Sequence, residues 1–318
     1  MRGQAVLVTG AYRSGSTWVG EMLAEAPGLF YIHEPFNPVV RVPGLPRIPV
    51  NHWFEYIHEG NEAQFLDPVD ALVAGRFNLW NDIASGDIRS MRAFVRSMGH
   101  NLRHKAEVRS GARPLLKDPI AILAAEWLAE RYAMDVVVTI RHPAAFVSSV
   151  KRLGWPIDHA KEFLSQKDLM DRFLSPYADE IRASRVTDDL VDQASLTWKL
   201  LYHVVDQYRN SHPDWHFIYH EDLSLAPEEG FRALFESLAL AYTDHVAATV
   251  KKHSSSTNPR ELEVIGGKVA MTTTTYVNSR ANVTSWQRRL AQQEISRIRS
   301  IVEPVSARFY NETSWESI

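Results

Sequence analysis

The sequence predicts an α/β protein with three layers, in which helices cover both faces of a mostly parallel central sheet of about five strands. Three observations predict it. Short apolar, β-branched runs recur along the chain, and amphipathic helical patterns separate them. Near the N-terminus, a strand, a glycine-bracketed loop and a helix start follow each other directly. Of the 318 residues, 45% are hydrophobic, which is enough for a sizeable core.

The N-terminal stretch predicts a strand that leads into an anion-binding loop. The run Ala5–Val8 is apolar and is closed by Gly10, whereas the apolar spacing from Trp18 onward is helical. Gly10 and Gly15 therefore bracket a loop that ends at a helix N-terminus. Backbone N–H groups and the helix dipole favour an anion at such a place.

The same loop departs from the usual nucleotide-binding pattern at one position. Gly10, Gly15 and the pair Ser16-Thr17 match the phosphate-loop pattern G-x-x-x-x-G-K-[ST], except that Ser16 stands where lysine belongs. The cation lies three places earlier, at Arg13. A loop without that lysine is poorly suited to ATP or GTP hydrolysis but can hold a single 5′-phosphate.

The loop resembles the phosphosulfate loop of the sulfotransferases, which bind 3′-phosphoadenosine-5′-phosphosulfate (PAPS). The carbohydrate and bacterial branches are the most similar, since cytosolic members usually have lysine at the Arg13 position. The resemblance implies cofactor contacts from six consecutive residues: Arg13, Ser14, Gly15, Ser16, Thr17 and Trp18. An ordinary strand–turn–helix with a glycine corner is the alternative.

A carboxylate follows the second predicted strand. Leu29–His33 forms that strand, and Glu34 comes next, before Pro35, which favours an extended conformation at Glu34. If the strand is parallel to the first, Glu34 lies at the same ligand crevice. Carbohydrate sulfotransferases show a similar aromatic-rich strand ending in Glu-Pro. We therefore expect Glu34 to be the catalytic base; capping of a turn or helix is the alternative role for this carboxylate.

His33 is the substitute base, because a neutral histidine also suits that role. Side chains alternate along a strand, so we expect His33 and Glu34 to point in opposite directions. His52 and His58 are the next bases to test if neither residue acts.

An arginine follows the most clearly buried strand, Asp135–Ile140. Sulfotransferases place an arginine at the end of a central strand and a serine eight residues later on the 3′-phosphate of PAPS, and Arg141 and Ser149 have that spacing. Guanidinium suits phosphate because it donates in a planar fork and keeps its charge. The other two strands are expected at Arg113–Lys117 and Trp215–Tyr219.

We expect one sulfotransferase-like domain over residues 1–318, with lid or acceptor-site insertions at about 38–111 and 155–185 and a nucleotide flap at about 254–284. Within the first insertion, arginines at 89, 92, 96 and 103 share one helical face, which indicates either an acceptor surface or a solvated face. Arg280 is the weaker candidate for a nucleotide contact. Gly266-Gly267-Lys268 lies earlier than the glycine-rich lysine motif of the cytosolic branch.

The composition of the chain limits the kinds of partner and compartment that we expect for the protein. The 35 basic and 38 acidic residues give no polyanion-binding signature, so we expect no nucleic acid partner. The chain has no cysteine, which excludes disulfides and thiol catalysis. No apolar run is long enough for a membrane helix, and the first strand begins too early for a signal peptide, so we expect a cytoplasmic protein.

The resulting functional expectation is in-line transfer of the sulfuryl group of PAPS, without a metal, to a hydroxyl or amine of a small-molecule, carbohydrate or lipid acceptor, releasing PAP. Arg13 and the loop amides are expected to stabilise the leaving 5′-phosphate. Two alternatives remain. A phosphate-loop kinase or NTPase needs a Mg²⁺-holding aspartate, for which Asp118 is available, and a non-catalytic PAP- or nucleotide-binding protein needs no base.

Overall fold

The computed structural model describes residues 3–84, 86, 88, 90–259, 264–265, 268–269 and 278–316; at 84, 96, 100, 264, 265, 268 and 269 it describes the backbone alone. Contacts divide the chain into two compact units. The first contains residues 1–10, 16–137 and 235–241, and the second contains residues 11–15, 138–234 and 242–318. Arg89 and the pair Gly266-Gly267 lie outside the described residues, as do residues 260–263 and 270–277 of the expected flap.

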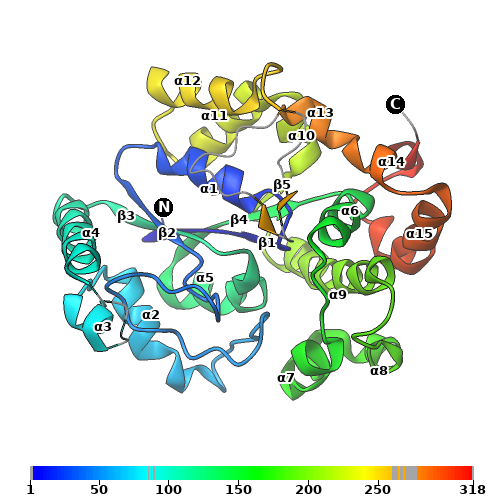
Figure 1. Ribbon diagram of the computed structural model, residues 1–318, viewed down its shortest axis with the longest axis horizontal. Helices are drawn as coiled ribbons and strands as arrows, with labels where there is room; N and C mark the ends of the chain where they lie inside the picture. The colour runs from blue at the N-terminus through cyan, green and yellow to red at the C-terminus, as the bar shows by residue number, and fades with distance from the viewer. Residues whose placement is uncertain are drawn as a thin grey trace. The chain divides into compact units, whose positions relative to one another are not determined.

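The five expected strands form one mostly parallel sheet in the order β2-β3-β1-β4-β5, which confirms the predicted fold class (Figure 1). The strands are β1 (Ala5–Gly10), β2 (Leu29–His33), β3 (Arg113–Lys117), β4 (Met134–Ile140) and β5 (His216–Tyr219). The parallel pairing of β2 with β3 sets His33 opposite Lys117. This register brings the last residues of both strands to the same edge.

Helices of the first unit cover the strands β1, β2 and β3. Figure 1 shows α1 on one side of these strands and α5 on the other. The helical elements of this unit are α1 (Ser16–Ala24), η1 (Glu62–Gln64), α2 (Leu66–Val73), α3 (Leu79–Ala84), α4 (Met91–Arg109), η2 (Pro119–Ala124) and α5 (Ala125–Tyr132). The insertion expected at about 38–111 therefore contains the helices α2 to α4 and follows β2 directly.

In the second unit, α6, α9 and α15 pack against one another (Figure 1). The long helix α9 buries Trp198 and Tyr202 between its neighbours. The elements before β5 are α6 (Pro143–Leu153), η3 (Ala160–Leu164), α7 (Lys167–Leu169), η4 (Met170–Leu174), η5 (Ser175–Tyr177), α8 (Ala178–Ala183) and α9 (Leu190–Ser211). The elements after β5 are α10 (His220–Leu225), α11 (Pro227–Ser237, whose last three residues group with the first unit), α12 (Asp244–Ser254), α13 (Ser279–Val283), α14 (Ser285–Arg289), α15 (Gln292–Ser306) and η6 (Glu312–Trp315). A two-residue antiparallel pair, β6 (Val264–Ile265) with β7 (Lys268–Val269), completes the described strands.

One predicted helix is broken in two. The apolar spacing over 287–309 predicts a single C-terminal helix, whereas the structure interrupts it at Leu290, whose backbone is extended (φ −106°, ψ 138°). The Glu294 carboxylate then accepts a hydrogen bond from the Ala291 N–H at 2.9 Å and so caps the new helix start. A local carboxylate cap competes here with continuation of the helix.

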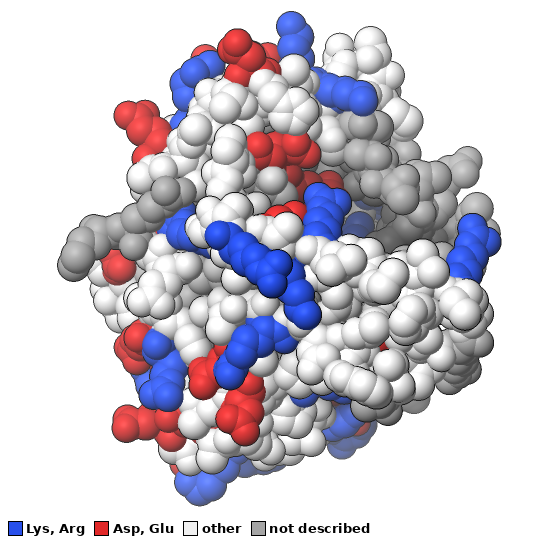
Figure 2. Space-filling view, turned by 90° about the vertical axis from the view of Figure 1, so that its left-hand side faces the viewer, with Lys and Arg blue, Asp and Glu red and all other residues white. Residues whose placement is uncertain are grey.

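Charged side chains of both signs share the surface. Figure 2 shows lysine and arginine side chains interspersed with aspartate and glutamate on one face, with several of the basic ones in a strip near its centre. No helix among the described residues is long and apolar enough to cross a membrane.

Candidate active site: an arginine cluster and a carboxylate–lysine pair

Three of the predicted nucleotide-binding residues lie together in the second unit. The Arg13 Nε donates to the Ser149 Oγ at 3.0 Å, and the Arg141 Nη1 donates to the backbone carbonyl of Arg13 at 2.6 Å. We call Arg13, Arg141 and Ser149 the arginine cluster. It brings together residues from the loop after β1, from the end of β4 and from the middle of α6.

Arg13 adopts a backbone conformation that non-glycine residues rarely take. Its φ is +64°, in the left-handed region. Such a conformation costs on the order of 1–3 kcal/mol and persists only where the surrounding contacts fix it. Here the Arg141 guanidinium holds the Arg13 carbonyl, and the Ser14 N–H closes a turn onto the Ala11 carbonyl at 3.1 Å.

Ser14 supports the loop from inside. Its hydroxyl lies 2.5 Å from the Ala11 carbonyl and 2.5 Å from the Thr139 Oγ1, and its N–H closes the turn just described. Both Ser14 donors therefore have partners within the protein, and the side chain is fully buried. These contacts give Ser14 a structural part in the turn, and its predicted contact with the nucleotide stays a prediction.

The Arg141 side chain is buried and its backbone is fixed at both ends. The Arg141 N–H donates to the Tyr202 hydroxyl at 2.9 Å, and the Trp198 indole N–H donates to the Arg141 carbonyl at 2.9 Å. The guanidinium is held on the Arg13 carbonyl, yet its Nε has no partner among the described residues, and neither has the buried Ser148 hydroxyl on α6. Among the described residues no carboxylate forms a direct ion pair with Arg141, although the charge of the buried Glu221 carboxylate acts on its guanidinium. A buried donor without a protein partner leaves room for a bond to a ligand, an ion or a water molecule.

Two histidines beside the cluster are neutral. Burial, with a smaller contribution from Arg141, lowers the pKa of His142 to about 3 and that of His220 to about 3. The positive charge of the cluster therefore belongs to its arginines. Gly15 is necessary next to His220, because a Cβ at Gly15 (φ +99°) would lie 2.6 Å from the His220 Nδ1.

C-terminal aromatic rings surround His142, which the sequence analysis did not anticipate. The Trp286 ring stacks on the imidazole at 5.1 Å between centroids, and the Tyr310 and Trp315 rings meet it edge-on. The Glu221 carboxylate accepts from the His142 N–H at 3.0 Å and from the Tyr310 hydroxyl at 3.1 Å. The end of the chain thereby fixes the segment that follows Arg141.

Arg280 does not join the arginine cluster. It lies on α13 with an exposed side chain, and its Nη2 donates to the Leu225 carbonyl at 2.9 Å. It lines an open groove of about 340 Å³ together with residues of α10 and α12, among them Ser224 and Ser254. α13 itself is anchored because the Ser279 hydroxyl donates to the Ser224 carbonyl at 2.9 Å.

The first unit contains an ion pair at the ends of β2 and β3. The Lys117 Nζ lies 2.5 Å from the Glu34 Oε1, and the Asn37 Nδ2 donates to the Glu34 Oε2 at 2.8 Å. We call Glu34 and Lys117 the carboxylate–lysine pair. The Lys117 side chain is completely buried and that of Glu34 is 19% exposed. Burial raises the pKa of Glu34, but the charge and hydrogen bond of Lys117, with smaller help from His33 and Asn37, outweigh it and lower the pKa overall.

Two geometric expectations about Glu34 are wrong. Its backbone is left-handed, with φ +47°, rather than extended as the following proline suggests. The Glu34 N–H donates to the Lys117 carbonyl at 2.8 Å, and the Glu34 carbonyl accepts from the Asn37 N–H at 3.1 Å, which fixes this turn. Because the turn ends the strand alternation, His33 and Glu34 converge, with 3.8 Å between the His33 Nε2 and the Glu34 Oε1. Burial and then Lys117 lower the pKa of His33.

Asp118 holds the turn that carries Glu34. One of its oxygens accepts from the Phe36 N–H at 2.7 Å and the other from the Ile120 N–H at 3.1 Å. The side chain is fully buried, and burial raises its pKa to about 7 against these hydrogen bonds. With both oxygens directed at backbone amides, Asp118 is a structural residue and lacks the open geometry of a Mg²⁺ ligand.

Lys117 is the partner of Glu34 that the sequence analysis missed. The sequence contained one indication of it, because a lysine ends the strand β3 just before Asp118-Pro119. The register of the parallel strands then places this lysine opposite His33. Its aliphatic stem passes Gly20 on α1, where a Cβ would lie 2.6 Å from the Lys117 Cγ. The glycine in α1 thus leaves room for the buried lysine.

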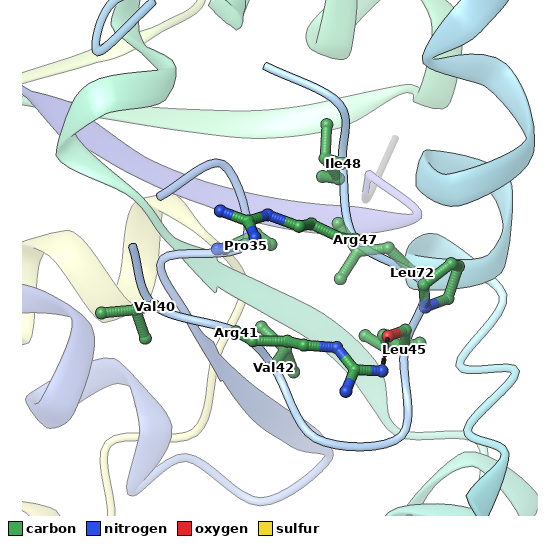
Figure 3. A pocket seen from close by; sticks show the side chains of 9 residues that line it. Pro35, Val40, Arg41, Val42, Leu45, Arg47, Ile48 and Leu72 are labelled. Atoms are coloured by element: carbon green, nitrogen blue, oxygen red, sulfur yellow. Dashed lines mark hydrogen bonds between the residues drawn. The ribbon is translucent and has the colours of Figure 1, made fainter. Parts of the chain in front are cut away.

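The loop after Glu34 encloses a small cavity of about 10 Å³, room for a single water molecule (Figure 3). Arg41 and Arg47 lie at its edge. The Arg41 Nη2 donates to the Leu45 carbonyl at 3.1 Å and to the Asn81 carbonyl at 2.5 Å. Arg41 therefore ties the loop to α3.

Comparison with known protein families identifies the family of this chain. A family model described as "Sulfotransferase family" matches residues 5–244, about three-quarters of the chain. The chain belongs to the sulfotransferase family. The matched range contains the arginine cluster and the carboxylate–lysine pair, and it ends before Arg280. As a member of this family, the protein is classed with the transferases that carry out sulfotransfer.

Solved sulfotransferases resemble the chain over most of its length at low identity. A sulfotransferase domain from the curacin biosynthetic pathway is 14% identical, with 95% of this chain and 98% of that chain covered and a TM-score of 0.48. The sulfotransferase STF9 from Mycobacterium avium is 13% identical, with 98% and 78% covered and a TM-score of 0.46. A mouse sulfotransferase complexed with PAP is 11% identical, with 99% and 88% covered and a TM-score of 0.43. No curated protein sequence matches the chain.

Proposed function

We propose that the protein transfers the sulfuryl group of PAPS to a hydroxyl or amine of a small-molecule, glycan or lipid acceptor and releases PAP. The observation that carries the proposal is the arginine cluster, in which the buried Arg141 guanidinium keeps a donor without a partner in the part of the chain that the structure describes. A phosphate group supplies the acceptors that such a donor lacks, and its charge matches the guanidinium.

The donor residues fit PAPS in number and type. Arg141 and Ser149 are assigned to the 3′-phosphate, with the Ser148 hydroxyl as a further donor. The N–H groups of Gly15, Ser16, Thr17 and Trp18, at the start of α1, are assigned to the 5′-phosphate, because the first amides of a helix have no acceptor within the helix. Arg13 is assigned to the bridging oxygen, where negative charge grows as the bond to sulfur breaks. Arg280 remains the candidate for a later phosphate contact.

Glu34 is proposed as the general base. The pairing with Lys117 keeps it ionised at neutral pH, since its pKa is lowered. Each carboxylate oxygen has a second lone-pair direction, so the hydrogen bonds from Lys117 and Asn37 leave capacity to accept the acceptor's proton. Lys117 and Asp118 are positioning residues in this proposal, and His33 is the alternative base.

Transfer of label from ³⁵S-PAPS to a panel of sugars, phenols, amines and lipids tests the proposal. We expect metal-independent transfer that continues in excess EDTA and yields stoichiometric PAP. Activity that requires Mg²⁺ and prefers ATP would support the kinase alternative. Tight PAP binding without transfer to any acceptor would support a binding protein.

A further inference from the structure

The helix α4 carries an exposed apolar stripe. Met91, Val95, Met98 and Leu102 follow each other at spacings of four, three and four, which places them on one face of the helix. Their exposed fractions are 77%, 56%, 40% and 61%. A helix of a globular protein ordinarily turns such a stripe toward the core.

The opposite face of α4, which packs on the protein, is polar. The Ser97 hydroxyl donates to the buried Asp82 carboxylate, and the Asn101 Nδ2 lies 3.4 Å from the same carboxylate. The buried His104 ring stacks on Phe77 with 4.4 Å between centroids. These contacts fix the rotation of α4 about its axis, so the outward direction of the apolar stripe is a property of the folded helix.

Basic residues accompany the stripe. α4 contains five arginines and lysines and a single acidic residue, Glu107, whereas the whole chain has more acidic than basic residues. Arg92, Arg103 and Lys105 are exposed, and the Arg103 side chain is 79% exposed despite its ion pair with Glu107. Positive charge is thus concentrated beside the apolar surface.

The neighbouring helix α3 also exposes large apolar side chains. Trp80 is 70% exposed and Ile83 is 42% exposed. Figure 1 shows α3 and α4 next to each other at the edge of their unit. An exposed tryptophan next to a basic, apolar helix is typical of a protein that contacts the headgroup region of a bilayer.

We propose that α4, together with Trp80 and Ile83 of α3, binds the surface of an anionic lipid bilayer. The apolar stripe enters the boundary between headgroups and acyl chains, and Arg92, Arg103 and Lys105 pair with lipid phosphates. Charge favours this occupant over a second copy of the chain, because two α4 helices would bring their arginines and lysines together. Binding to a bilayer surface does not depend on the proposed sulfuryl transfer; it would determine where the protein is located.

Co-sedimentation of the full chain with vesicles tests the proposal. We expect binding to vesicles of phosphatidylcholine with 30% phosphatidylglycerol, weaker binding in high salt, and little binding to phosphatidylcholine alone. The variant Arg92→Glu/Arg103→Glu should bind at least about 25-fold more weakly, roughly fivefold for each charge removed. Val95→Asp/Leu102→Asp should lose at least about tenfold, since it places charge in the apolar stripe. Val186→Asp, at another exposed valine (47%), is the matched control and should bind as the wild type does.

A fluorescent label reports insertion directly, because the chain has no cysteine of its own. A polarity-sensitive dye on Leu102→Cys should shift to the blue with anionic vesicles, and the same dye on Val186→Cys should not. Unchanged thermal midpoints and PAP affinities verify that each variant is folded. An unshifted dye at position 102 or equal binding to neutral vesicles would overturn the proposal. A wild-type dimer in sedimentation velocity that Leu102→Asp dissociates would overturn it in favour of contact between copies.

Discussion

In the arginine cluster, the Arg141 guanidinium donates to the backbone carbonyl of Arg13, whose own guanidinium donates to the Ser149 hydroxyl. Among the described residues no carboxylate forms a direct ion pair with Arg141. In the carboxylate–lysine pair, one cation faces one anion at 2.5 Å. The first arrangement keeps positive charge that no described carboxylate pairs with directly, whereas the second pairs one positive charge with one negative charge. In the proposed reaction the first region meets the anionic nucleotide and the Glu34 carboxylate of the second accepts the proton. The difference predicts that Arg141→Ala weakens ligand binding, whereas Glu34→Gln slows the chemical step.

Glu34→Gln gives the largest expected effect. It keeps the size of the side chain and removes the base, so turnover should fall by roughly 10²- to 10⁴-fold. Single-turnover transfer from labelled PAPS measures this, with His33→Ala as the control. If His33→Ala abolishes transfer and Glu34→Gln does not, the base is the histidine; if neither matters, His52 and His58 become the next candidates.

Lys117→Met should change the pH dependence of the reaction. In the wild type the pairing with Lys117 lowers the pKa of Glu34 and keeps the proposed base ionised to a lower pH than an ordinary glutamate, so the rate should be level through the mildly acidic range. Without Lys117, burial raises the pKa of Glu34, and the acidic limb of kcat should move upward by a pH unit or more. An unchanged profile would contradict the pairing.

The same substitution leaves a buried carboxylate without its cation, which destabilises a fold by about 3–5 kcal/mol. The double variant Lys117→Met/Glu34→Gln removes both charges and should regain much of that stability. Chemical denaturation of the single and double variants measures the difference. Equal stabilities would show that the pair is not coupled.

Gly20→Ala tests the room left for the buried lysine. The new methyl group would crowd the Lys117 stem at 2.6 Å, so we expect about 1–3 kcal/mol of destabilisation. Gly99→Ala is the matched control on α4, because a Cβ there meets nothing within 4 Å. That variant should be neutral or up to about 1 kcal/mol more stable. Urea denaturation measures the change in unfolding free energy for both variants. If Gly99→Ala is as destabilising as Gly20→Ala, the loss does not come from crowding of Lys117.

A further prediction concerns acid stability near the arginine cluster. His142 and His220 have pKa values of about 3 in the folded protein, below the ordinary value, so the unfolded chain binds protons that the native state does not. Their contribution to stability is present above pH 6.5 and is lost as pH falls toward 3. His220→Asn should reduce the dependence of unfolding free energy on pH by about 1.4 kcal/mol per pH unit in this window. The raised pKa of Asp118 changes stability with pH in the opposite direction. This contribution is the same in the wild type and in His220→Asn, so it cancels when their pH dependences are compared. Identical slopes would show that His220 is charged in the native state.

The fold was predictable because its signals are local. The apolar runs at Leu29–His33 and Arg113–Lys117 became strands with the expected bounds, and Arg141 and Ser149 met Arg13 through the order and spacing of their elements. The conformation of Glu34 was not predictable from Pro35, because hydrogen bonds from distant residues, Lys117 and Asp118, override the local preference.

Two other features could not be predicted because they also depend on residues distant in the sequence. The ring of aromatic residues around His142 comes from the far end of the chain, and the outward stripe of α4 depends on which face Asp82 anchors. Helical periodicity shows that a helix has two faces, but it does not show which face the rest of the protein covers.

Titration of PAP into the wild type, Arg141→Ala and Glu34→Gln by calorimetry tests the central claim, that one region binds the nucleotide and the other performs proton transfer. Loss of one charge-assisted phosphate contact costs on the order of 1.5–3 kcal/mol, so Arg141→Ala should bind PAP about ten- to a hundredfold more weakly. Its affinity for adenosine 5′-phosphosulfate, which lacks the 3′-phosphate, should barely change, and Glu34→Gln should bind PAP as the wild type does. Equal losses for both ligands in Arg141→Ala, or a comparable loss of PAP affinity in Glu34→Gln, would contradict the account.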